Sequence, residues 1–231
     1  MKMQKNGYKS IRELSVKLKP LRVQSLGEEI ANSITHGIGV AFSITALVLL
    51  VVLASLYGDA WRIVSFSIYG VTLIILYLAS TLYHSLTNPK AKNFFHYLDH
   101  SAIFLLIAGT YTPVTLVALR ETVGWILFAL IWTLAIGGII FKAVAKGRFR
   151  IISVIIYLAM GWIVVIAIKP ILSAVPIGLL SWLIIGGLSY SLGIIFYALK
   201  KMPFHHMVWH IFVLCGSISH FFGILFYLTR K

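Results

Sequence analysis

The chain has 231 residues, of which 60% are hydrophobic and 11% are charged, and its mean hydropathy is +0.95. A soluble domain carries about 25% charged residues, so this composition excludes an ordinary soluble fold and predicts an integral membrane protein. The net charge of +14 would suit a nucleic-acid partner, but the basic residues lie in loops and at the N-terminus, so we expect no nucleic-acid binding.

Residues 1–32 form a basic segment that we treat as a separate N-terminal region. No short apolar stretch with a small-residue cleavage site follows its start, so we do not expect a cleaved signal peptide. Ser10 and Glu13 have the spacing of a capping box, and Ile11, Leu14 and Leu18 fall on one helical face. The pattern fits a short amphipathic helix on the membrane surface and a disordered basic tail equally well.

Residues 33–231 form the predicted transmembrane domain, an all-α bundle of seven helices. Each apolar segment is long enough for a helix of about 20 residues, and none alternates as a membrane barrel strand does. Pro113 predicts a kink in the third segment, and Lys169-Pro170 should end the fifth. The segments cover approximately residues 33–56, 61–86, 95–119, 123–141, 151–168, 177–199 and 206–228.

The distribution of lysine and arginine predicts how the bundle is oriented. With the N-terminus inside, 15 of these residues lie on the inner side and 5 on the outer side. Positive charge accumulates on the cytoplasmic side of membrane proteins. We therefore expect a cytoplasmic N-terminus and an outer C-terminus.

Seven of the eight histidines fall in or next to the cytoplasmic ends of the segments under this orientation. His206 and His210 begin the seventh segment, and their i, i+4 spacing places them on one helical face. His84 ends the second segment at the same depth. A catalytic zinc ion takes three protein ligands and leaves one position for water. These three histidines are therefore candidate zinc ligands.

Two further residues suit the chemistry of such a site. Asp99 is the only carboxylate within the apolar segments, and it is placed to bind the metal or to act as a general base on its water. Ser80 lies one turn before His84 on the same face, where its hydroxyl can support the ligands.

The spacing of two histidines is a weak signal by itself, because His96 and His100 repeat it. We expect His96 and His205 to be solvated or near lipid headgroups, and His100 to hydrogen-bond another helix. His220 is deeper in the seventh segment, where a hydrogen-bonded interior histidine is the usual role. From the residues alone, a metal site and a pair of packed histidines both remain open.

Several motifs together resemble the bacterial hemolysin III family. That family belongs with the progestin and adipoQ receptors, which include the adiponectin receptors, and more distantly with the alkaline ceramidases. The resemblance runs from about Gly27 to the C-terminus. Its motifs are Glu29-x-x-Asn32-x-x-x-His36-Gly37, Ser80-Thr-Leu-Tyr-His84, Leu98-Asp99-His100, Ala108-Gly-Thr-Tyr-Thr-Pro113 and His206-x-x-x-His210.

The resemblance implies a seven-helix protein with a cytoplasmic N-terminus, in the inner membrane of a bacterial cell. It also implies a zinc ion (Zn2+) near the cytoplasmic side, held by His84, His206 and His210, and it favours this histidine pair over His96 and His100. Asp99 matches the aspartate that holds the zinc-bound water, and Ser80 matches the motif serine. The motifs add further polar candidates, namely Glu29, Asn32, His36 and His100.

These residues predict a zinc-dependent hydrolase of lipid amides or esters. Its partners would be membrane lipids, and the acyl chain of a lipid substrate would enter the bundle from the bilayer. One alternative is a receptor-like or membrane-homeostasis protein in which zinc ties the second and seventh helices together. A hemolysin-type pore is a weaker alternative, because the apolar segments carry few polar residues beyond the inner-leaflet set.

Overall fold

The computed structural model describes residues 24–145 and 150–230, and every regular element in these ranges is helical. Seven of its helical spans are long and apolar enough to cross a membrane, as predicted. The elements are α1 (Leu26–Tyr57), α2 (Ala60–Ser85), α3 (Pro89–Pro113), a π-helical turn (Val114–Ala118), α4 (Thr122–Ala145), α5 (Arg150–Trp162), a 3-10 stretch (Ile163–Ala167), α6 (Ile168–Ala174), α7 (Ile177–Ala198) and α8 (His205–Leu228). The amphipathic helix and capping box expected in the N-terminal segment lie outside the described residues.

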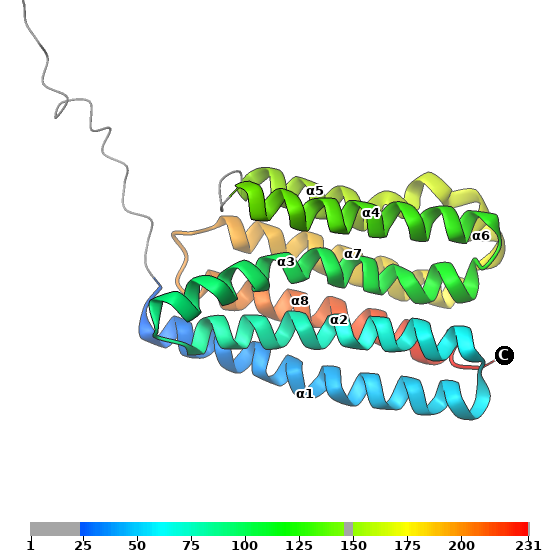
Figure 1. Ribbon diagram of the computed structural model, residues 1–231, viewed down its shortest axis with the longest axis horizontal. Coiled ribbons are helices and arrows are strands. Elements are labelled where there is room, and N and C mark those ends of the chain that lie inside the picture. Colours follow the sequence, from blue (N-terminus) through cyan, green and yellow to red (C-terminus); the bar gives the residue numbers. More distant parts are fainter. Residues whose placement is uncertain (1–23, 146–149, 231) are drawn as a thin grey trace, which may run out of the picture.

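The helices lie with their long axes roughly parallel, as Figure 1 shows. Helix α1 packs on α2 and α8, α2 packs on α3, α3 packs on α4, and α7 packs along α8. The core between α1, α2, α3 and α8 contains the wholly buried side chains of Leu50, Phe66, Tyr69 and Tyr77. Many leucine, isoleucine and valine side chains are exposed on the outside, which suits a surface surrounded by lipid.

Short connections make successive spans antiparallel, so the same ends of alternate helices meet. At one end of the bundle α1, α3, α5 and α8 begin while α2, α4 and α7 end. We call this the histidine end, because α2 finishes there just after His84 and α8 starts there with His205 and His206. It corresponds to the side that the charge distribution predicts to be cytoplasmic.

Helix α1 begins at Leu26, earlier than the predicted start near Ser33. The reason is a capping box: the Glu28 N–H donates to Ser25 Oγ (3.3 Å), and the Ser25 N–H donates to Glu28 Oε2 (2.8 Å). The polar residues that precede the first apolar run are therefore helical, and their side chains have fixed positions at the histidine end.

Two prolines shape the spans, and one of them does so differently from expectation. The predicted end of the fifth segment at Lys169-Pro170 is wrong, because α6 carries the helix through both residues to Ala174. The chain tightens into a 3-10 stretch just before this proline, which lacks an N–H and crowds the carbonyl four residues earlier. At Pro113, α3 passes into a π-helical turn.

Candidate metal centre

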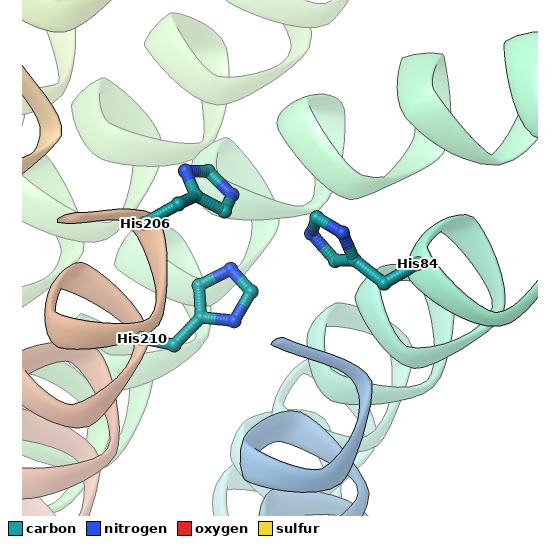
Figure 2. A group of neighbouring side chains, drawn as sticks. All are labelled: His84, His206 and His210. Carbon is teal, nitrogen blue, oxygen red and sulfur yellow. The ribbon is translucent and has the colours of Figure 1, made fainter. Parts of the chain in front are cut away.

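Three histidines from two helices converge at the histidine end. His84 lies in the last turn of α2, and His206 and His210 lie in the first turns of α8. One ligand nitrogen from each lies within 4.8 Å of the others. The ring centroids are 4.5 Å apart for the α8 pair, and that of His84 lies 5.2 Å from His206 and 5.1 Å from His210. Figure 2 shows the three rings pointing toward one another.

The hydrogen-bonding state of these rings fits a metal ion. His84 Nε2 and His206 Nε2 are buried and have no hydrogen-bond partner among the described residues. An unsatisfied buried polar atom costs about 1–3 kcal/mol, and a metal would remove that cost. His210 Nδ1 donates to the Asn32 carbonyl oxygen at 3.4 Å, so its Nε2 carries the lone pair. Three neutral imidazoles are a donor set that suits zinc.

A carboxylate from α1 orients the His84 ring. His84 Nδ1 lies 2.6 Å from Glu29 Oε2, and the Lys92 ammonium donates to Glu29 Oε1 at 2.9 Å. A carboxylate only accepts hydrogen bonds, so the proton is on Nδ1 and the Nε2 lone pair faces the other histidines. This carboxylate–histidine arrangement is the usual support of a metal-ligating imidazole.

The next two turns of α1 also contribute to the centre. Asn32 Nδ2 lies 3.5 Å from His84 Nδ1, while the Asn32 carbonyl accepts the His210 contact described above. The His36 ring stacks on His210 with a centroid distance of 3.5 Å and an interplanar angle of 14°. Both nitrogens of His36 are buried without a partner among the described residues. Because these side chains and Glu29 recur every three to four residues, they share one helical face.

Asp99 and Ser80 are both buried near the ligands. Asp99 on α3 is 7% exposed and lines the same cavity as His206 and His210. Ser80 lies one turn before His84 and is wholly buried, and its Oγ has no hydrogen-bond partner within the described ranges. Asp99 and two of the candidate ligands thus border one cavity.

The expectation for His100 was wrong. Within the described residues its ring does not hydrogen-bond another helix, because its Nδ1 turns back to the His96 carbonyl (3.2 Å) and to Asp99 Oδ2 (3.3 Å), both on α3. The link to another helix comes from its backbone instead, since the Tyr157 hydroxyl on α5 donates to the His100 carbonyl at 2.7 Å. His100 therefore orients Asp99 from the same helix.

A cavity of about 200 Å³ extends from the histidine end between α3, α5, α7 and α8. It reaches from His206 to His220, whose Nε2 donates to the Leu183 carbonyl at 3.2 Å, as expected for an interior histidine. Fourteen residues of helix span about 21 Å, more than the roughly 15 Å of one hydrocarbon leaflet. Its lining along this length is mainly apolar, including Leu106, Val114, Leu180, Ile194 and Val213.

Two residues at this end were missed from the sequence. The fourth segment was predicted to end near residue 141, but α4 runs to Ala145, so Lys142 is helical, only 8% exposed and part of the cavity wall. The apolar residues 143–145 were the sequence feature that could have predicted a longer fourth helix that includes Lys142. Glu28 accepts the Phe204 N–H at 2.9 Å through its Oε1, which fastens the start of α8 to α1.

Residues 24–221 match the sequence model of the family described as Haemolysin-III related. The chain belongs to the haemolysin III family. The hemolysin-3 homolog of Bacillus subtilis (strain 168) is 52% identical over 206 residues, which cover 89% of this chain and 97% of the relative. Hemolysin-3 of Bacillus cereus is 52% identical over 205 residues, covering 89% of this chain and 94% of that protein.

The similarity extends to a human protein. Monocyte to macrophage differentiation factor of Homo sapiens is 30% identical over 215 residues, which cover 88% of this chain and 86% of the human chain. This match agrees with the resemblance to the progestin and adipoQ receptor superfamily. Family membership and the seven spans together make this haemolysin III protein a multi-pass integral membrane protein.

Proposed function

We propose that this haemolysin III protein is a zinc-dependent hydrolase of lipid amides or esters in the inner membrane of a bacterial cell. The observation that carries the proposal is the set of three converging histidines, two with buried unpartnered Nε2 atoms, at the polar end of a long apolar cavity. The cavity would hold the acyl chain of a membrane lipid. Its length would then place the scissile carbonyl beside the histidines.

The residues around the site have separate roles in this reaction. His84, His206 and His210 would hold the zinc ion, which supplies a Lewis acid that activates water at neutral pH and polarises a carbonyl. Glu29 keeps the lone pair of His84 aimed into the site. Asp99 takes the proton from the attacking water and returns it to the leaving amine or alcohol. The products are a fatty acid and the freed amine or alcohol.

A receptor-like or membrane-homeostasis function with a structural zinc ion is the second candidate. It is favoured by the fact that the histidines join α2 to α8, two helices far apart in sequence. The relatives' name suggests a pore as a third function. We rank it last because the cavity wall is mainly apolar between the histidine end and His220.

The decisive experiment measures lipid amide and ester turnover together with zinc content in purified protein. We expect Asp99→Ala to keep its zinc but to lose turnover by about 10²–10⁴-fold, the usual contribution of a general base. His206→Ala should lose both, and wild-type protein treated with a chelator should lose turnover. His96→Ala is the matched control, since it removes a histidine of α3 with the same spacing, and it should retain both.

Two results would decide against the hydrolase. If wild-type protein, chelated protein and His206→Ala share one background rate for every lipid tested, the enzyme proposal is lost. If turnover is absent throughout while His210→Ala melts far below the wild type, the zinc is structural and the second candidate replaces the first.

A further inference from the structure

Lys142 is a buried cation that has no role in the proposed hydrolysis. It lies one turn before the end of α4, is 8% exposed, and lines the cavity together with Asp99 and His206. An ionisable side chain within a membrane span is energetically expensive and is usually retained for function. Lys142 lies on the cavity wall and not on the lipid-facing surface, so a ligand in the cavity would lie beside it.

The local contacts hold Lys142 close to the candidate centre. Its Nζ donates to the Tyr157 hydroxyl at 3.5 Å, and that hydroxyl donates to the His100 carbonyl at 2.7 Å. Two hydrogen bonds therefore connect the ammonium to the backbone of the residue that follows Asp99. Tyr157 also lines the cavity, so the lysine and the hydroxyl form one polar patch on its wall, supplied by α4 and α5.

The chemistry of this patch selects a type of ligand. An ammonium has three donors and no acceptor, so it recognises acceptor atoms, and most strongly those of an anion. A neutral amide or alcohol would gain much less from it in surroundings of low dielectric constant. The rest of the cavity wall suits an acyl chain. The patch and the wall together therefore match an amphiphile with a negatively charged group near the head of its chain.

We propose that Lys142, supported by Tyr157, binds a carboxylate or phosphate of an anionic single-chain lipid whose acyl chain occupies the cavity. Lys142 is then a residue that determines ligand specificity at the histidine end. The inference deepens the proposed function by naming the charge of the ligand, and it rests on that proposal only in placing a lipid in the cavity.

The test is competition for the cavity in purified full-length protein, with a fluorescent fatty alcohol as a neutral probe and a chelator in every sample. The chelator prevents a carboxylate from binding through a metal ion. The anionic competitors are a long-chain fatty acid and a monoacylglycerol phosphate. They are compared with the fatty alcohol and the fatty amine of the same chain length. We expect at least one anionic competitor to displace the probe at about tenfold lower concentration than the alcohol, as a charge-assisted contact predicts.

Variants then assign the preference to one side chain. Lys142→Met should bring the anionic and neutral competitors to equal affinity while leaving the alcohol unchanged, and Lys142→Arg should keep the preference. Lys200→Met is the matched control, because Lys200 is an exposed cation in the turn after α7 at the same end. Binding of the neutral probe reports whether each variant is folded, and Lys142→Gln replaces Lys142→Met if that variant does not bind the probe.

Three results would overturn the inference. They are equal affinity of anionic and neutral lipids in the chelated wild type, an anionic preference that survives Lys142→Met, and an equal loss of preference in Lys200→Met. The outcome is independent of catalysis, since a protein that hydrolyses no lipid but shows the Lys142-dependent preference refutes the hydrolase alone.

Discussion

Helices α3 and α8 both start at the histidine end, and each carries two histidines four residues apart near its start. The ring centroids are 4.4 Å apart for His96 and His100 and 4.5 Å apart for His206 and His210. Among the described residues, the α8 pair is the one that forms a cluster of possible metal ligands with a third histidine, His84. On α3, His100 is instead engaged by its own helix. Equal spacing thus gives unequal sites, because the partner helix decides which nitrogens remain available.

The two helix starts are also built differently. Helix α3 is capped locally: Asn88 Oδ1 accepts the N–H groups of Lys90 (3.0 Å) and Ala91 (3.2 Å), with Pro89 at the first helical position. The residue before α8 offers no side-chain cap. Phe204 has a positive φ of 54°, and its N–H is bound by Glu28 of α1. The position of the α8 histidines therefore depends on a contact 176 residues away in sequence.

The largest expected effect comes from removing one histidine of each pair. His206→Ala should reduce zinc from about one ion per chain to background, because three ligands are the usual number for an open zinc site. His96→Ala should keep the metal. Elemental analysis of both purified variants makes the measurement. Equal zinc loss in the two would show that the α8 pair is not distinct from the α3 pair.

An intermediate effect is expected from the carboxylate that supports His84. Glu29→Gln keeps the shape of the side chain but removes the charge beside His84 Nδ1, and such outer partners contribute about 10–100-fold to metal affinity. Competition with a zinc indicator measures the change. Lys92→Met is the control and should alter affinity less than about fivefold, because its part-exposed pair contributes under about 1 kcal/mol. A larger loss for Lys92→Met would make the ion pair, and not the histidine contact, the important one.

The smallest effects on zinc binding should come from the two helix starts, whose main effect is on stability. Glu28→Ala leaves the N–H groups of Ser25 and Phe204 without their charged acceptor, which should reduce the free energy of unfolding by about 2 kcal/mol or more. Asn88→Ala should reduce it by about 1 kcal/mol, the usual value of a lost cap. Thermal unfolding in detergent compares them, and only Glu28→Ala should also weaken zinc binding. If zinc affinity is the same in both variants, the α1 contact does not position α8.

Local features of the sequence were sufficient for the seven spans and for the polar residues they bring to one end. They failed at the boundaries, where three helices extend beyond the predicted segments. Helix α1 starts early because of Ser25, α4 includes Lys142, and α6 continues through Pro170. A capping box sets the start of α1, and a 3-10 stretch precedes the passage of the fifth span through Pro170.

The sequence by itself determined that this is a seven-helix membrane protein. A stretch of about 20 apolar residues in a bilayer must satisfy its backbone hydrogen bonds internally, and a helix does so. The i, i+4 spacing also determined that His206 and His210 share a face. The family motifs implied that His84 is the third ligand beside this pair.

Only the tertiary structure decided which faces of the helices meet. Spans that are apolar nearly all round do not specify their rotation about the helix axis, so spacing could not say that His84 faces the α8 pair or that His36 stacks on His210. Nor could it place Lys142 on the cavity wall. Those positions follow from the packing of α1 against α2 and α8, and of α4 and α5 around the cavity. That packing turns a repeated histidine spacing into one candidate metal centre.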